Sequence, residues 1–238
     1  MKYVVMSDVH ANWPALQSVY SATSDADGYI FLGDLIGLGG FPEEVVKSIK
    51  SESDHAIKGN HDVSVIENKK GHVNSQELSE FELQTTQDAL DEEDKEWVSN
   101  LDAYEEMESP SALIAHAEPY PESASGVQSA GVKKGDYTKV ASNVDSDEYD
   151  YVLLGHTHDQ AKLDCSDFGH DLTVVNPGSV GQPINSGVAH YAIIDTDTGQ
   201  VSLEQSSYDK EKVFSRLESL NVPIKWWERS NRRRRRRI

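Results

Sequence analysis

The sequence is poor in cysteine and contains no long apolar run. Its 238 residues include a single cysteine, Cys165, so no disulfide can form within the chain. No stretch of about 18 apolar residues occurs, which excludes an ordinary transmembrane helix. The opening segment, Met1–Asp8, lacks the apolar centre of a signal peptide. These absences predict a cytoplasmic protein with no membrane partner.

Basic residues are also scarce, except at the C-terminus. Residues 1–228 hold 15 basic and 41 acidic side chains, a net charge of −26, whereas residues 229–238 hold seven arginines. Residues 1–228 are so acidic that they should repel nucleic acid. Acidity of this kind also keeps proteins soluble in concentrated salt, which indicates a halophilic archaeal source. The consecutive arginines should repel one another and stay disordered. An incidental extension is the default interpretation; the alternatives are binding to RNA, to a neighbour's acidic surface or to the body of this same protein.

Strand-like and helix-like segments alternate in the first part of the chain. Apolar runs at Lys2–Ser7, Gly28–Gly33 and Asp54–Asn60 read as strands, and Ala11–Thr23 and the segment opened by Pro42 have helical periodicity. Such alternation is typical of parallel βαβ units, so the sequence predicts an α/β fold.

The remainder of the chain begins with a polar stretch and continues with further strands. Residues 63–109 are helical in character, with Asp91 as a helix cap, and residues 119–147 read as a loop with one helix. The last two strands should form an antiparallel hairpin that turns at Gly199, followed by an amphipathic segment, Asp209–Leu220. The predicted strands of this part are Ser111–His116, Tyr151–Leu154, Leu172–Val175, His190–Asp195 and Val201–Ser206.

Side chains that bind divalent metals follow five of the strand-like segments. In chain order these residues are Asp8, His10, Asp34, Asn60, His61, Asp62, His116, His156 and His158. The carboxyl ends of strands in an open α/β sheet face one crevice, so these side chains should meet there. Carboxylate and imidazole ligands suit Mn, Fe, Ni or Zn. Two such ions about 3.5–4 Å apart need a shared carboxylate between them.

The motifs around these residues resemble those of the calcineurin-like metallophosphoesterase superfamily, and of its small single-domain prokaryotic phosphoesterases in particular. The motifs are S-D-V-H-A-N, G-D-L-I-G, G-N-H-D, the lone His116, G-H-T-H and N-P-G-S-V-G-Q-P, and the resemblance extends from about Met1 to Asp195. It implies an α/β fold, a four-layer α-β-β-α sandwich. The expected parts are a metallophosphoesterase domain at 1–208, a helical segment at 209–228 and a disordered Arg-rich tail at 229–238.

The resemblance also implies a role for each residue of the set. One metal ion would be held by Asp8, His10, Asp34 and His158. The other would be held by Asp34, Asn60, His116 and His156, with Asp34 bridging the two. His61 is the implied catalytic residue, Asn60 and His61 would contact the phosphate, and a carboxylate such as Asp62 would orient His61. Mn²⁺ is the expected ion, with Fe, Ni or Zn as alternatives.

Several other residues have no place in these motifs or serve them indirectly. The turn Asn176–Ser179 should support the site without ligating metal, and Trp13 is expected to pack in the core more than to line the substrate pocket. Surface or structural roles are expected for His55, His72, His170 and His190.

The implied reaction is hydrolysis of a small phosphate monoester or diester by a metal-bridging hydroxide. A nucleotide or dinucleoside polyphosphate hydrolase is an alternative within the same enzyme class. A non-catalytic scaffold is an alternative of a different class, because the superfamily includes a retromer subunit that lost the catalytic histidine. His61 and every ligand position are retained in this sequence, which favours an enzyme.

Overall fold

Two five-stranded mixed sheets form the centre of the computed structural model, which describes residues 1–68, 76–119, 137–142, 144, 148–182 and 184–222. The strands of the first sheet, in spatial order, are β10 (Gln200–Ser207), β9 (Val188–Asp195), β1 (Lys2–Met6), β2 (Gly28–Leu32) and β3 (His55–Ile57). Those of the second are β4 (Tyr104–Glu108), β5 (Ser111–Ala115), β6 (Tyr151–Leu154), β8 (Thr173–Pro177) and β7 (Gln160–Asp164).

Each sheet has a parallel centre. In the first sheet β1 pairs in parallel with β2, and β2 with β3; in the second, β5 pairs with β6 and β6 with β8 in the same way. The antiparallel strands β9, β10, β4 and β7 are added beside them. The strands that the sequence predicts to precede metal ligands are therefore the parallel ones, and their carboxyl ends share one edge in each sheet.

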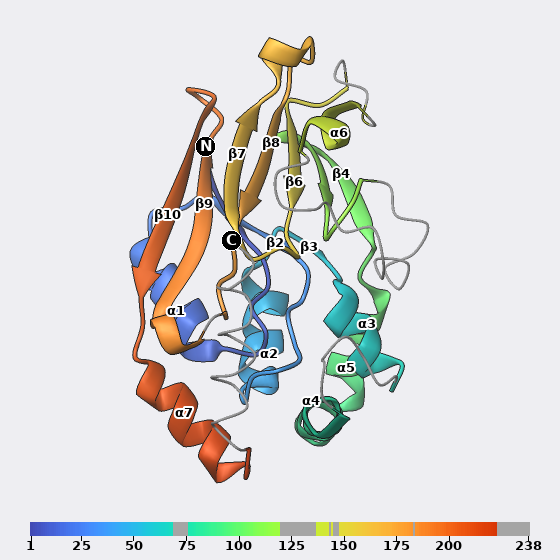
Figure 1. Cartoon of the computed structure of the whole chain (residues 1–238), viewed down its shortest axis with the longest axis vertical. Coiled ribbons are helices and arrows are strands. Elements are labelled where there is room, and N and C mark those ends of the chain that lie inside the picture. Colours follow the sequence, from blue (N-terminus) through green and yellow to red (C-terminus); the bar gives the residue numbers. More distant parts are fainter. Residues whose placement is uncertain (69–75, 120–136, 143, 145–147, 183, 223–238) are drawn as a thin grey trace.

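The helices lie outside the two sheets and at one end of them (Figure 1). Their bounds are α1 (Trp13–Ala22), α2 (Pro42–Glu52), α3 (Asn60–Ile66), α4 (Gln76–Ala89), α5 (Glu92–Asn100), α6 (Tyr137–Ser142) and α7 (Lys210–Ser219). Short 3-10 turns occur at Ser166–Phe168 and Ile184–Ser186. Within the described residues, none of these helices is both long and apolar enough to cross a membrane.

Alternation along β1 shows how the layers arise. Tyr3 and Val5 point into a core between the two sheets, whereas Val4 and Met6 point into a second core beneath α1 and α2. A third core, which includes Leu154 and Val140 of α6, covers the outer face of the second sheet. Each fully buried aliphatic side chain contributes about 1.5–3 kcal/mol by leaving water. The predicted four-layer α-β-β-α sandwich is confirmed.

Some element boundaries differ from those that the sequence predicts. Helix α1 begins at Trp13 because Ala11 adopts a left-handed backbone conformation and Asn12 caps the helix by accepting from the Ala15 N–H. Strand β3 ends at Ile57, since Asn60 already belongs to α3. The predicted Asp91 cap is present, accepting from the Asp94 N–H.

The sequence does not predict two of the strands, β4 and β7. β4 falls within residues 63–109, which the sequence predicts to be helical, and β7 follows directly after the G-H-T-H motif. Both are edge strands with few buried residues, and in β4 only Met107 is buried. The apolar alternation that indicates a strand is therefore nearly absent, and pairing with β5 decides the conformation.

The segment after β10 packs on the body of the molecule. Val213 and Leu217 of α7 are fully buried against Leu38 and Ile184. The proposed division at residue 208 stays a prediction, and residues 223–238, which include the arginine run, lie outside the described residues.

Candidate metal centre

The loops at the carboxyl ends of the parallel strands are tied to one another by backbone hydrogen bonds. The Asp8 N–H donates to the Gly33 carbonyl at 3.0 Å, and the His10 N–H donates to the Asp34 carbonyl at 2.9 Å. On the second sheet the Gly155 N–H donates to the His116 carbonyl at 2.8 Å. Residues distant in sequence are thereby brought to one place.

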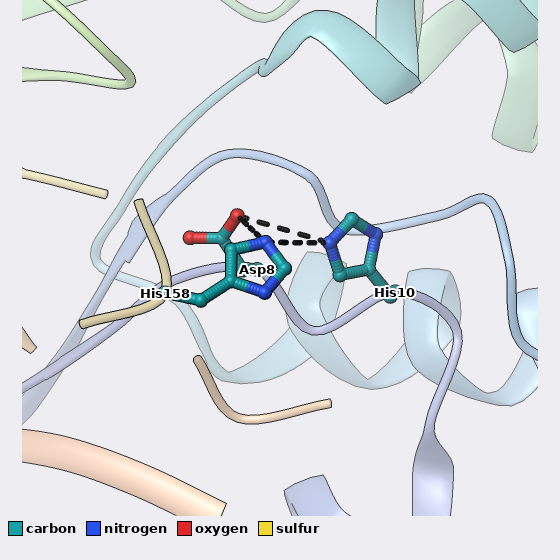
Figure 2. Close-up of side chains that lie close together, drawn as sticks. All are labelled: Asp8, His10 and His158. Carbon is teal, nitrogen blue, oxygen red and sulfur yellow. Dashed lines mark hydrogen bonds and ion pairs between the residues drawn. The ribbon is translucent and has the colours of Figure 1, made fainter. Parts of the chain in front are cut away.

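The first cluster of ligand atoms consists of Asp8, His10 and His158, whose side chains converge in Figure 2. His158 Nε2 lies 2.8 Å from Asp8 Oδ1 and 3.2 Å from His10 Nε2, and His10 Nε2 lies 3.7 Å from the same carboxylate oxygen. Two ring nitrogens that face each other beside a buried carboxylate oxygen form a donor set suited to a cation.

The second cluster consists of Asp34, His116 and His156, whose ligand atoms lie within 4.8 Å of one another. His116 Nε2 lies 3.3 Å from Asp34 Oδ2, and that same oxygen lies 3.9 Å from His10 Nε2 of the first cluster. Asp34 therefore stands between the two clusters, in the position that a bridging carboxylate requires.

Two residues expected to hold the second metal ion have buried polar atoms without hydrogen bonds within the described part of the chain. Among the described residues, Asn60 Oδ1 and His116 Nε2 are buried and have no hydrogen-bond partner. Leaving such an atom unpaired costs about 1–3 kcal/mol. Amide oxygen, imidazole nitrogen and carboxylate oxygen are all ligands for divalent Mn, Fe or Zn, so the residues present fit such an ion.

Neighbouring groups hold the ligand side chains by the atoms that face away from the clusters. Ser7 Oγ and the His156 N–H donate to Asp8 Oδ2 at 2.7 and 2.9 Å, leaving Oδ1 toward His158. Asp34 Oδ1 accepts from the His61 N–H at 2.7 Å, and His116 Nδ1 lies 2.6 Å from the Leu32 carbonyl oxygen. Supporting contacts of this kind orient metal ligands in proteins.

The backbone at this centre is strained. Five of the nine non-glycine residues with positive φ in the described chain are predicted ligands, namely Asp8, His10, Asp34, His156 and His158. Each such conformation costs on the order of 1–3 kcal/mol, and strain of this kind collects at functional sites.

Electrostatics favours ionised carboxylates and at least one neutral imidazole. Burial would raise the pKa of Asp34, but the neighbouring His116 and His61 bring that pKa well below its ordinary value. Burial together with His116 lowers the pKa of His156 to about 4. Burial would lower the pKa of His116, but the neighbouring Asp34 carboxylate outweighs it and raises that pKa to about 10. A metal ion would take the place of the proton on His116.

A ring nitrogen of His61 lies within 4.8 Å of ligand atoms of His10 and Asp34, and His61 also contacts a carboxylate that the sequence did not indicate. Its Nδ1 is 2.5 Å from Glu82 Oε1, and both side chains are buried. Burial lowers the pKa of His61, but Glu82 and Asp34 outweigh it and raise that pKa to about 9. The ring of His61 meets that of His10 edge-on, with centroids 4.9 Å apart.

The expectation that Asp62 orients His61 is wrong. Both oxygens of Asp62 accept backbone N–H groups, from Leu35, Ile36 and Gly59, at 2.8–3.2 Å. Asp62 thus holds the loops after β2 and β3 together. Glu82 lies in the polar helix α4, outside every motif, so the sequence does not indicate its role. The structural signal is that one face of this helix is buried, with Ser79, Glu82 and Thr86 on it.

The turn Asn176–Ser179 supports the site, as expected. Asn176 Nδ2 donates to the Gly155 carbonyl at 2.7 Å, and Ser179 Oγ donates to the Asp8 carbonyl at 2.9 Å. Trp13 is half-buried against the core beneath α1, in line with its expected packing role.

The remaining histidines are accounted for as follows. His55 lies on the edge strand β3, and its Nδ1 is 2.6 Å from Glu105 Oε1. His170 and His190 are half-buried and belong to neither cluster. His72 lies outside the described residues.

The fold and the donor set define a metallophosphoesterase-type protein, and comparison with known proteins gives the family. Residues 1–199 match the calcineurin-like phosphoesterase superfamily domain, so the chain belongs to this family. A metallophosphoesterase of Sphaerobacter thermophilus has a similar structure, with a TM-score of 0.79, 21% identity, and coverage of 96% of this chain and 97% of that one.

Two further relatives are archaeal. The structure of a hypothetical protein of Pyrococcus horikoshii matches with a TM-score of 0.74 and 19% identity over 95% of this chain and 96% of its own. An uncharacterized protein of Methanocaldococcus jannaschii is 26% identical over 92% of this chain and 93% of its own length. These likenesses extend over nearly the whole chain and support the fold.

Proposed function

We propose that the protein is a dimetal hydrolase of small phosphate monoesters or diesters. The observation that carries this proposal is the position of Asp34, whose carboxylate adjoins both the Asp8–His10–His158 cluster and the His116–His156 pair. In this proposal Asp34 completes the first cluster to four ligands and Asn60 completes the second, as the sequence predicts. Mn²⁺ is the proposed ion, with Fe, Ni or Zn as alternatives.

Bound divalent ions would lower the pKa of a water molecule and offset the negative charge of the phosphoryl group. The chain supplies the remaining chemistry. The Asn60 amide would donate a hydrogen bond to a phosphoryl oxygen as charge accumulates there. Burial lowers the pKa of His61, but Glu82 and Asp34 outweigh it and favour the protonated ring, which would give a proton to the departing oxygen.

The arrangement favours an enzyme over a scaffold. A scaffold needs an interaction surface but has no use for buried, strained ligands or for a buried histidine held against a carboxylate. The acidic body disfavours polyanionic substrates, so a small phosphate ester is the proposed substrate. Nucleic acid remains a proposed partner only for the arginine run.

The first experiment is hydrolysis of a chromogenic phosphodiester and the matching monoester by metal-stripped protein in molar salt. Mn²⁺, Ni²⁺, Fe²⁺, Zn²⁺ and Mg²⁺ are added back separately. Turnover is expected with at least one ion, and hydrolysis of an alkyl phosphate ester, whose leaving oxygen must be protonated, should fall by about 10²–10⁴-fold in His61→Ala, the usual contribution of a general acid. A folded, metal-loaded protein without turnover on either ester would overturn the enzyme proposal in favour of the scaffold.

Metal content tests the ligand assignment. His156→Ala should reduce the bound ions from two per chain to one, because it removes a ligand of the second cluster. His190→Ala, at a half-buried histidine outside the clusters, is the matched control and should retain both ions. Elemental analysis of the dialysed proteins measures the difference. Two tightly bound ions in His156→Ala would refute the assignment.

A further inference from the structure

Glu82 is the carboxylate in contact with the ring of His61, although 20 residues separate the two in sequence. Glu82 lies on α4, and its Oε1 is 2.5 Å from His61 Nδ1. The Glu82 side chain is only 2% exposed and that of His61 11% exposed, so the contact is shielded from water. A shielded, charge-assisted hydrogen bond is roughly twice as strong as a neutral one.

The other nearby carboxylates have different partners. Asp62 is engaged by three backbone N–H groups, and Asp34 Oδ1 accepts the backbone N–H of His61, not a ring nitrogen. The geometry therefore leaves Glu82 as the carboxylate on Nδ1.

Gly37 provides the space through which Glu82 reaches His61. A Cβ atom added at Gly37 would collide with Glu82 Oε1 and would come within 3.3 Å of His61 Cβ. Gly37 also has a φ of +84°, a conformation that side chains rarely adopt. The G-D-L-I-G motif thus supplies Asp34 at one end and the clearance for Glu82 at the other.

Helix α4 presents an unusually polar face to the body. Ser79, Glu82 and Thr86, which recur at helical spacing, are each at most 3% exposed. Gln87 Nε2 donates to the Val65 carbonyl of α3 at 2.7 Å, which attaches α4 next to the helix that carries His61. A helix docked through polar groups can hold a carboxylate in place where an apolar face could not.

We infer that Glu82 is a positioning residue for His61, fixing the ring orientation and keeping the proton on Nδ1 so that Nε2 serves the departing oxygen of the substrate. The inference rests on the proposed function, because it assigns a proton donor within that reaction. A carboxylate behind a histidine acts in this way by selecting the tautomer and the orientation of the ring.

The kinetic test compares two substrates that differ in their need for a proton. Glu82→Gln keeps the shape of the side chain and removes its charge. Turnover of an alkyl phosphate ester, whose leaving oxygen must be protonated, is expected to fall by about 10–100-fold. Turnover of the nitrophenyl ester, whose leaving group is stable as an anion, should change by less than about threefold. Metal content should stay at two ions per chain.

Thr86→Val is the matched control. Thr86 lies one turn further along the same buried face of α4, and its hydroxyl has no hydrogen-bond partner among the described residues. This variant should leave the ratio of alkyl to nitrophenyl turnover unchanged. An equal loss on both esters in Glu82→Gln, or no loss on either, would overturn the inference.

A spectroscopic measurement separates the failure of this inference from the failure of the proposed function. In the Zn²⁺-loaded wild-type protein, ¹H–¹⁵N NMR should show a strongly downfield proton on His61 Nδ1, assigned by its loss in His61→Ala. The signal should be lost or moved upfield in Glu82→Gln and kept in Thr86→Val. A signal unchanged in Glu82→Gln would refute the contact itself. If Glu82→Gln loses the signal but the wild-type protein hydrolyses no ester, the contact between Glu82 and His61 stands and only its catalytic purpose is refuted.

Discussion

At the scale of single residues, the positive φ angles of Asp8, His10, Asp34, His156 and His158 are the most informative feature of the site. Neither aspartate nor histidine adopts this conformation without cost outside a turn that imposes it. Backbone hydrogen bonds between the loops help to hold Asp8 and His10 in place, which fixes the positions of their ligand atoms. Pre-arrangement of this kind lowers the cost of ordering ligands when metal binds.

The convergence of the expected ligand side chains could be predicted from the sequence, whereas the partner of His61 could not. Asp8, Asp34 and His116 each follow an apolar strand, so the position of the strand indicates where the side chain will lie. Glu82 is one of many acidic residues in a polar helical stretch, and no local pattern distinguishes it. Its role depends on the docking of α4 and on the space above Gly37, which are tertiary features.

Tyr208 gives a prediction about pH. Burial raises the pKa of Tyr208 to about 12, from 10.0 in the unfolded chain, and its hydroxyl meets Asn12 Nδ2 and the Ile184 carbonyl at 3.2 Å each. Above pH 10 the unfolded chain releases this proton while the folded protein keeps it. Stability should therefore fall by up to about 1.4 kcal/mol per pH unit between pH 10 and pH 12.

Tyr208→Phe tests this expectation. The variant should be less stable at pH 8 by about 0.5–1.5 kcal/mol, because it loses the hydroxyl contacts. The difference should shrink as the pH rises from 10 to 12, since phenylalanine has no proton to release. Urea unfolding followed across this range measures both slopes. Parallel slopes in the two proteins would contradict the assignment of this pH dependence to Tyr208.

At the scale of elements, α7 is part of the packed body although it follows the last strand. Its apolar face covers Leu38, which belongs to the loop after Asp34, and Ile184. Arg216 Nε donates to the Gly40 carbonyl at 2.9 Å in the same loop. Helix α7 therefore stabilises a loop that continues from the metal centre.

Leu217→Ala should reveal how much α7 contributes. Leu217 is fully buried, so its truncation is expected to cost about 2–5 kcal/mol in the free energy of unfolding. The exposed Glu218 on the same helix provides the control, and Glu218→Ala should change stability by less than about 0.5 kcal/mol. Chemical denaturation measures both. Equal stability of the two variants would show that α7 does not hold the loop.

The central parallel strands could be predicted because they are short, apolar and buried on both faces, as in β2 and β6. The edge strands β4 and β7 could not, because their side chains carry little of the apolar signal. For the same reason the end of β3 was placed too late: the residues from Gly59 onward look extended in sequence but begin α3, where the Asp62 carboxylate accepts the Gly59 N–H.

At the scale of the whole molecule, the most prominent feature is the large negative charge. A net charge of −26 over residues 1–228 repels itself, and salt screens that repulsion with a length of about 10 Å at 0.1 M and about 3 Å at 1 M. The unfolding temperature should therefore rise as KCl is increased from 0.1 to 2 M.

A charge variant separates screening from general salt effects. Glu106→Gln with Glu108→Gln removes two exposed charges from β4 and should reduce the dependence of the unfolding temperature on KCl. Calorimetry at several KCl concentrations measures the slope for both proteins. An identical slope would show that salt acts on this protein by some route other than charge.

The acidic β4 edge has a consequence for how copies of the chain meet. β4 is the outermost strand of its sheet, and such a strand offers backbone groups to which a second chain could add. Glu106 and Glu108 stand exposed along it, so two approaching edges would bring like charges face to face. The negative charges of Glu106 and Glu108 should therefore also prevent the β4 edges of two copies from pairing into a continuous intermolecular sheet.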